Sequence, residues 1–117
     1  MVLADTSVWI EHFRRGHQAF AELLADGLIM VHPFVCGELA CGNLKSRATA
    51  LSDILALPSA TLATNAEVLA FVQDRKLWGQ GLGGIDVHLL ASALISNCRL
   101  WALDRRLAQV ADELGLT

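Results

Sequence analysis

The sequence lacks the long apolar runs and the basic leader that mark membrane and secreted proteins. Its apolar stretches end within a few residues, as 28–31 does at His32, so no segment reaches the roughly 18 residues of a membrane span. Asp5 and Glu11 lie where a secretory signal would have a basic start followed by an unbroken apolar stretch. We therefore expect a cytoplasmic protein that makes no contact with a membrane.

Positive charge and paired cysteines are also scarce. Nine Lys and Arg against 12 Asp and Glu give a formal net charge of −3, which argues against binding nucleic acid through a broad basic surface. Chemistry on nucleic acid would therefore need a metal ion. The three cysteines are an odd number, and Cys36-x4-Cys41 with the distant Cys98 matches no zinc pattern. We expect reduced thiols that pack as small buried side chains.

The composition is that of a folded chain with apolar surface to spare. The 117 residues are 54% hydrophobic and 18% charged, the opposite of a disordered composition, and their number corresponds to one domain over 1–117. A chain this small leaves much of its surface exposed. The apolar excess therefore predicts a self-associating face, and we expect a homodimer.

Short apolar runs typical of buried strands alternate with segments of helical periodicity, without repeats or linkers. Gly27 suits a helix end, and Thr64 with Glu67 forms a capping-box pattern. We predict strands over 2–5, 28–31, 61–63 and 99–103, helices over 17–26, 47–57, 64–78, 86–97 and 104–115, and further helices opening at Thr6 and Pro33. This alternation predicts an α/β fold, with a central parallel sheet and helices on both faces.

Four carboxylates fall where a parallel sheet would place a ligand. Asp5 and Asp104 end predicted strands, and ligands bind beyond the carboxyl ends of such strands. Asp86 heads an otherwise mostly apolar helical stripe, and Glu38 lies in the turns after a strand. Taken singly, each aspartate is better explained as a helix N-cap and Glu38 as part of a solvated helix face.

Taken together, the four acids favour a metal site. Two carboxylates about 5 Å apart repel by about 3 kcal/mol at an effective dielectric near 20, so a cluster of four needs a cation. Mg²⁺ or Mn²⁺ fits because both prefer oxygen ligands and keep several waters. Such an ion activates water and neutralises charge on a phosphate, which predicts phosphodiester hydrolysis by a nuclease.

Four segments in this order resemble a known family: Leu3-Ala-Asp5-Thr6-Ser7, Cys36-Gly-Glu38-Leu-Ala, Gly84-Ile-Asp86-Val-His-Leu-Leu-Ala and Leu100-Trp-Ala-Leu-Asp104-Arg-Arg-Leu. Over essentially the whole chain they are similar to a PIN domain of the VapC type, the ribonuclease toxins of type II toxin–antitoxin modules. Each segment alone is weakly specific. Four in sequence within so short a chain are fairly specific.

The resemblance implies a three-layer α/β/α sandwich, metal-dependent endonucleolytic cleavage of RNA, a homodimer and inhibition by a cognate antitoxin protein. It also implies that one acidic cluster is both catalytic and metal-binding, with Asp5 and Asp86 as main ligands, Glu38 and Asp104 completing it, and Thr6 and Ser7 supporting Asp5. Ala102 departs from the pattern, since many relatives carry Thr there. The end at Thr117 predicts a short sheet edge.

Other interpretations remain open at this point. Residues 79–84 satisfy G-x-G-x-x-G, but they follow a predicted helix instead of a strand, which argues against a dinucleotide site. A receiver-like Mg²⁺-binding module needs a lysine on a late strand, and the only lysines are Lys45 and Lys76. A decayed PIN domain acting as a non-catalytic binding protein is a further alternative. The basic residues are expected to be mostly solvated, with some along an RNA path.

Overall fold

Three short parallel strands form the sheet in the computed structural model, which describes residues 1–117. β1 (Val2–Ala4) lies between β2 (Ile29–Met30) and β3 (Arg99–Trp101), with Val2 paired to Ile29 on one side and to Arg99 on the other. Every side chain of β1 is buried. Because successive side chains of a strand point to opposite faces, both faces of the sheet are covered. The predicted α/β fold with a central parallel sheet is confirmed.

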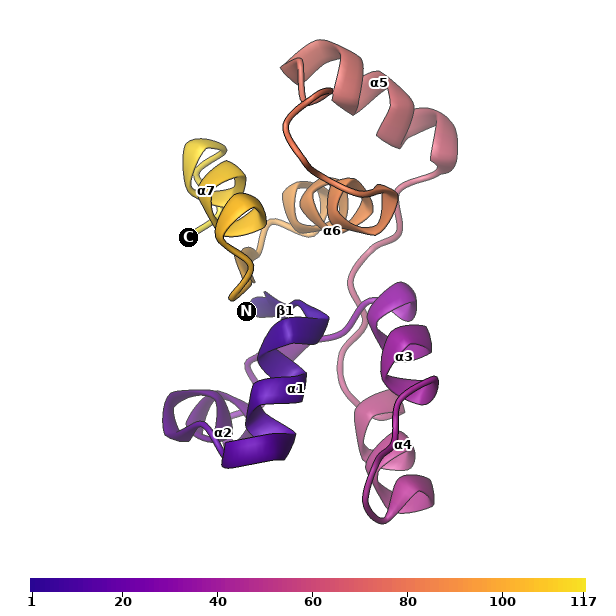
Figure 1. Ribbon diagram of the computed structural model, residues 1–117, viewed down its shortest axis with the longest axis vertical. Coiled ribbons are helices and arrows are strands. Elements are labelled where there is room, and N and C mark those ends of the chain that lie inside the picture. Colours follow the sequence, from indigo (N-terminus) through magenta and orange to yellow (C-terminus); the bar gives the residue numbers. More distant parts are fainter.

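The chain forms seven helices, some of which contact the strands while others pack on neighbouring helices (Figure 1). They are α1 (Thr6–Arg15), α2 (Gln18–Ala25), α3 (Pro33–Ala40), α4 (Arg47–Leu55), α5 (Asn65–Arg75), α6 (Gly84–Ile95) and α7 (Arg105–Glu113). The molecule measures 41 × 24 × 23 Å, with α5 near one end of the long axis and α2 and α4 near the other (Figure 1). None of the helices is long and apolar enough to cross a membrane.

The strand predicted at 61–63 does not form. The chain pairs with the sheet slightly earlier, where the Val31 N–H donates to the Pro58 carbonyl and the Ala60 N–H donates to the Val31 carbonyl. The Thr61 N–H instead donates to Ser96 Oγ at 2.8 Å, which takes the backbone away from the strand direction. A single bridge at Ser59 therefore stands where a fourth strand was predicted.

The core cluster contains 23 buried residues and extends from the sheet to the helices on either side. Trp9 is buried on α1, where its ring meets Phe20 of α2 edge-to-face at 4.8 Å. Ile10 and Phe13 of the same helix are 44% and 42% exposed. Position 10 follows Trp9 by only about 100° around the helix, so it turns away from the face that α2 covers.

The cysteines follow the prediction only in part. All three are free thiols, and Cys98 is buried as expected. Cys36 is half-buried on α3, and burial raises the pKa of its thiol. Cys41 is exposed because it lies at the C-terminal cap of α3, where the chain leaves the core. The prediction of a buried side chain is wrong for Cys41.

Candidate active site

Asp5 lies directly after β1 and is held by two hydrogen bonds from Ser7. Its Oδ2 accepts from Ser7 Oγ at 2.8 Å and from the Ser7 N–H at 3.4 Å, so it caps α1. Ser7 Oγ also accepts from the Leu103 N–H at 3.1 Å, which joins the start of α1 to the chain after β3. Asp5 is 8% exposed. The predicted support of Asp5 by Ser7 corresponds to a direct contact.

Asp104 lies at the same edge of the sheet, after the neighbouring strand. The Asp5 N–H donates to the Trp101 carbonyl at 2.9 Å, so the carboxyl ends of β1 and β3 are level. Asp104 begins α7, where its Oδ2 accepts from the Leu107 N–H at 2.9 Å. Both aspartates are therefore N-caps, as the single-residue interpretation predicted, and they also share one sheet edge.

Glu38 reaches the start of α1 from α3. Its Oε1 accepts from Thr6 Oγ1 at 2.6 Å, and this hydrogen bond joins residues 32 positions apart. Thr6 was predicted to support Asp5, and that prediction is wrong in its partner. The side chains of adjacent helical residues point in different directions, so Ser7 contacts Asp5 while Thr6 turns toward α3.

Asp86 lies in the first turn of α6, where its Oδ2 accepts from the Gly83 N–H at 2.9 Å. The side chain is half-buried. Burial, and then the charges of Asp5, Asp104 and Glu38, raise its pKa above the ordinary value, while the hydrogen bond from Gly83 lowers it. The charges of all three other acids act on Asp86, so the four carboxylates belong to one electrostatic environment.

The four carboxylates have the donor chemistry of a site for a hard cation. Each uses one oxygen for a hydrogen bond within the protein and leaves the other oxygen without a protein partner. No three His, Cys, Asp or Glu side chains are gathered as a ready-made ligand set. Oxygen donors of like charge match Mg²⁺ or Mn²⁺, which binds through a few carboxylates and retained waters.

Asp86→Asn is expected to change how the stability of the metal-free protein depends on pH. Because the folded-state pKa of Asp86 is raised, its contribution favours folding below the unfolded pKa and is lost as pH rises through the folded pKa. From about pH 3 to pH 6 the variant should therefore gain in melting temperature relative to wild type. Melts in EDTA test this, with Asp74→Asn on α5 as an exposed control. If the melting temperatures of Asp86→Asn and wild type changed in parallel with pH, the raised pKa of Asp86 would be contradicted.

The glycine-rich segment before α6 shapes the rim of this site. Gly79 and Gly81 have φ angles of 70° and 78°, which side chains rarely adopt, and Gly81 lies against the Arg106 side chain of α7. The segment follows α5 and not a strand, and its Gly83 N–H binds Asp86. The segment thus lacks the strand–turn–helix context of a dinucleotide site.

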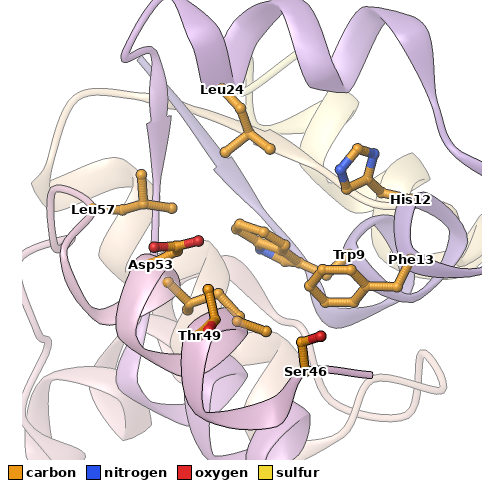
Figure 2. A pocket seen from close by; sticks show the side chains of 10 residues that line it. Trp9, His12, Phe13, Leu24, Ser46, Thr49, Asp53 and Leu57 are labelled. Carbon is orange, nitrogen blue, oxygen red and sulfur yellow. The ribbon is translucent and has the colours of Figure 1, made fainter. Parts of the chain in front are cut away.

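A separate pocket of about 340 Å³ lies between α1, α2 and α4 and contains none of the four acids (Figure 2). Trp9, Leu24 and Leu57 give it apolar walls, with Asp53 at one side (Figure 2). Trp9 Nε1 and His12 Nδ1 are buried without hydrogen-bond partners. Sequence periodicity does not predict this pocket, because it forms only where α4 packs beside α1 and α2.

Comparison with known proteins agrees with this fold. A family model described as the PIN domain matches residues 2–113. Ribonuclease VapC32 of Mycobacterium tuberculosis (strain CDC 1551 / Oshkosh) is 44% identical over 117 residues, covering 99% of this chain and 94% of that protein. Ribonuclease VapC32 of strain ATCC 25618 / H37Rv matches equally well. The predicted resemblance is confirmed, and the chain belongs to the PIN-domain family, with close relatives of the VapC type.

Proposed function

We propose that this protein is a Mg²⁺-dependent endoribonuclease that hydrolyses RNA phosphodiester bonds and acts as the toxin of a type II toxin–antitoxin module. The observation that carries the proposal is the set of four carboxylates, each with one oxygen free of protein partners, in which the charges of three act on the fourth, Asp86. Support also comes from relatives named ribonuclease that match almost the entire chain. The presence of all four acids favours an active enzyme over a decayed binding domain.

In this proposal Asp5 and Asp86 are the main metal ligands, with Glu38 and Asp104 completing the pocket. The bound ion lowers the pKa of water and neutralises charge that grows on the phosphate. Ser7 Oγ holds Asp5 Oδ2 at 2.8 Å and leaves the other carboxylate oxygen, Oδ1, available to the ion. Thr6 is a positioning residue that fixes the Glu38 carboxylate at 2.6 Å. Manganese is expected to substitute for magnesium because it prefers the same oxygen donors.

Cleavage of a pool of structured RNAs by the purified protein tests this function. RNA cleavage is expected with Mg²⁺ or Mn²⁺ and none with EDTA, because the carboxylates alone supply no Lewis acid to activate water or neutralise the phosphate charge. Asp86→Asn protein purified in parallel controls for contaminating nuclease. Cleavage that persists in EDTA, or that Asp86→Asn retains, would overturn the proposed metal site. Metal binding by a folded protein that cuts no RNA would favour a binding role.

We further propose a homodimer. Large apolar side chains remain exposed on several elements, which leaves surface for a second copy of the chain. The most exposed are Leu55 (69%), Leu69 (64%), Trp78 (58%) and Leu62 (54%). Sedimentation equilibrium tests this proposal, and a monomer throughout the micromolar range would contradict it.

The antitoxin is proposed to seat an apolar segment in the pocket of Figure 2. The unpartnered Trp9 N–H offers a donor to a carbonyl of an incoming chain, and the pocket walls offer apolar contact. Thr49→Arg would fill this pocket with a charged side chain, at a position that does not line the second pocket described below. It should weaken binding of the antitoxin encoded in the same module while free protein still cuts RNA. Unchanged affinity would place the antitoxin elsewhere.

A further inference from the structure

A second pocket, of about 330 Å³, lies between the end of α1 and the segment that joins α3 to α4. Its lining is Phe13, Arg14, Asn43, Leu44, Lys45 and Ala50, and we call it the cationic pocket. It holds two cations and no carboxylate, in a protein where acids outnumber bases by 12 to 9. The local charge is therefore opposite in sign to that of the molecule.

The two cations of this pocket are free to bind an external anion. The one ion pair in the structure joins Arg15 to Glu11 at 3.6 Å, and it involves neither Arg14 nor Lys45. Both side chains are exposed. Cations without carboxylate partners are the groups with which proteins contact RNA phosphates, and this contact is independent of sequence.

An exposed aromatic ring stands beside these cations. Phe13 is 42% exposed, and its ring packs against Trp9 at 5.8 Å and His12 at 5.9 Å between ring centroids. These contacts support one part of the ring and leave the rest open, next to Ser46 at the pocket rim in Figure 2. Single-stranded RNA is typically bound by cations that hold its backbone and aromatic rings on which its bases stack.

We propose that the cationic pocket binds one nucleotide of the RNA substrate, and this inference rests on the proposed function. Arg14 and Lys45 hold the phosphate, Phe13 stacks on the base, and the Asn43 amide is within the same pocket to meet the base edge. Because α1 starts beside Asp5 and rises about 1.5 Å per residue, Phe13 lies about 12 Å along the helix from the acids. The bound nucleotide is thus close to the scissile bond without being part of it.

Binding of an end-labelled, mixed-sequence single-stranded RNA tests the pocket separately from catalysis. The measurement uses the cleavage-disabled Asp5→Asn background in EDTA, over a series of salt concentrations. Adding Arg14→Ala or Lys45→Ala should weaken binding and lower the slope of log K against log salt by about 0.7 for each lost phosphate contact. Lys45→Arg keeps the positive charge and should therefore keep both the affinity for RNA and the salt slope. Phe13→Leu should weaken binding about tenfold with little change in slope, because stacking carries no charge.

Kinetics in the otherwise wild-type chain give the second readout. Arg14→Ala and Lys45→Ala should raise KM while kcat stays within about twofold, as expected for removing an interaction equally strong in ground and transition states. Lys76→Ala, an exposed lysine after α5, is the matched control and should leave KM and slope unchanged.

The two proposals fail in different ways. If wild type cleaves RNA but the Arg14, Lys45 and Phe13 variants match it in KM, affinity and salt slope, the pocket is not an RNA site and the proposed function stands. If wild type cleaves nothing yet binds RNA in a way that depends on Lys45, the pocket stands and the proposed activity fails. No RNA binding at all by the folded protein would overturn the inference.

Discussion

Asp5→Asn is expected to lower kcat/KM for RNA cleavage by more than about 10³-fold while the protein stays folded. Asparagine caps helices as well as aspartate does, so its carbonyl oxygen can accept the hydrogen bonds that Ser7 now gives to Asp5 Oδ2. The change replaces the free carboxylate oxygen with an amide and removes one negative charge. Magnesium is bound less tightly when one of its carboxylate ligands becomes a neutral amide.

Asp26→Asn is the matched control for this substitution. Asp26 also lies at a helix end, after α2, but it is exposed and belongs to no acidic cluster. Cleavage rates with Mg²⁺, metal titrations followed by calorimetry, and thermal melts separate loss of the ion from loss of the fold. An Asp5→Asn protein that is folded, binds Mg²⁺ normally and cuts RNA would remove Asp5 from the site.

Acid should destabilise the wild-type protein by about 2–3 kcal/mol between pH 7 and pH 4.5 through His32 alone. His32 is fully buried; burial first, and then the charge of His88, lowers its pKa from 6.5 to about 4. In this window the unfolded chain takes up a proton that the folded protein does not. The contribution of His32 to the free energy of unfolding is therefore fully present above pH 6.5 and is lost as pH falls toward 4.

His32→Asn tests this because it removes the titration and keeps the cap. The His32 Nδ1 accepts from the Phe34 N–H at 3.0 Å at the start of α3, and an asparagine carbonyl can take the same role. Urea unfolding at both pH values gives the difference for each protein. His17→Asn, the same exchange at the cap of α2, controls for losing one imidazole. An equal acid loss in His32→Asn would contradict the assignment.

Much of the site could be predicted because its residues obey local rules. Asp5 and Asp104 follow strands, and the carboxyl ends of parallel strands meet at one edge whatever the rest of the chain does. Asp86 was identifiable from the apolar stripe that it heads, of which Leu89 and Leu90 are fully buried. These are properties of a strand or a helix on its own, and so they are present in the sequence.

Other features depend on contacts between distant segments, which periodicity does not encode. The bond between Thr6 and Glu38 requires the relative placement of α1 and α3. The diversion of Thr61 requires a hydroxyl 35 residues away, at Ser96. Among the histidines, His32 caps a helix from a buried position, and its environment is supplied by the packing of α6 as well as α3.

Phe13 and Ala50 line both the pocket between α1, α2 and α4 and the cationic pocket, so the two cavities share a wall. A polypeptide seated in the first and a nucleotide stacked in the second would need the same ring. If both proposed sites are used, RNA would lower the affinity for the antitoxin by the same factor by which the antitoxin lowers the affinity for RNA. On this arrangement, abundant substrate would itself help to release the enzyme from its inhibitor.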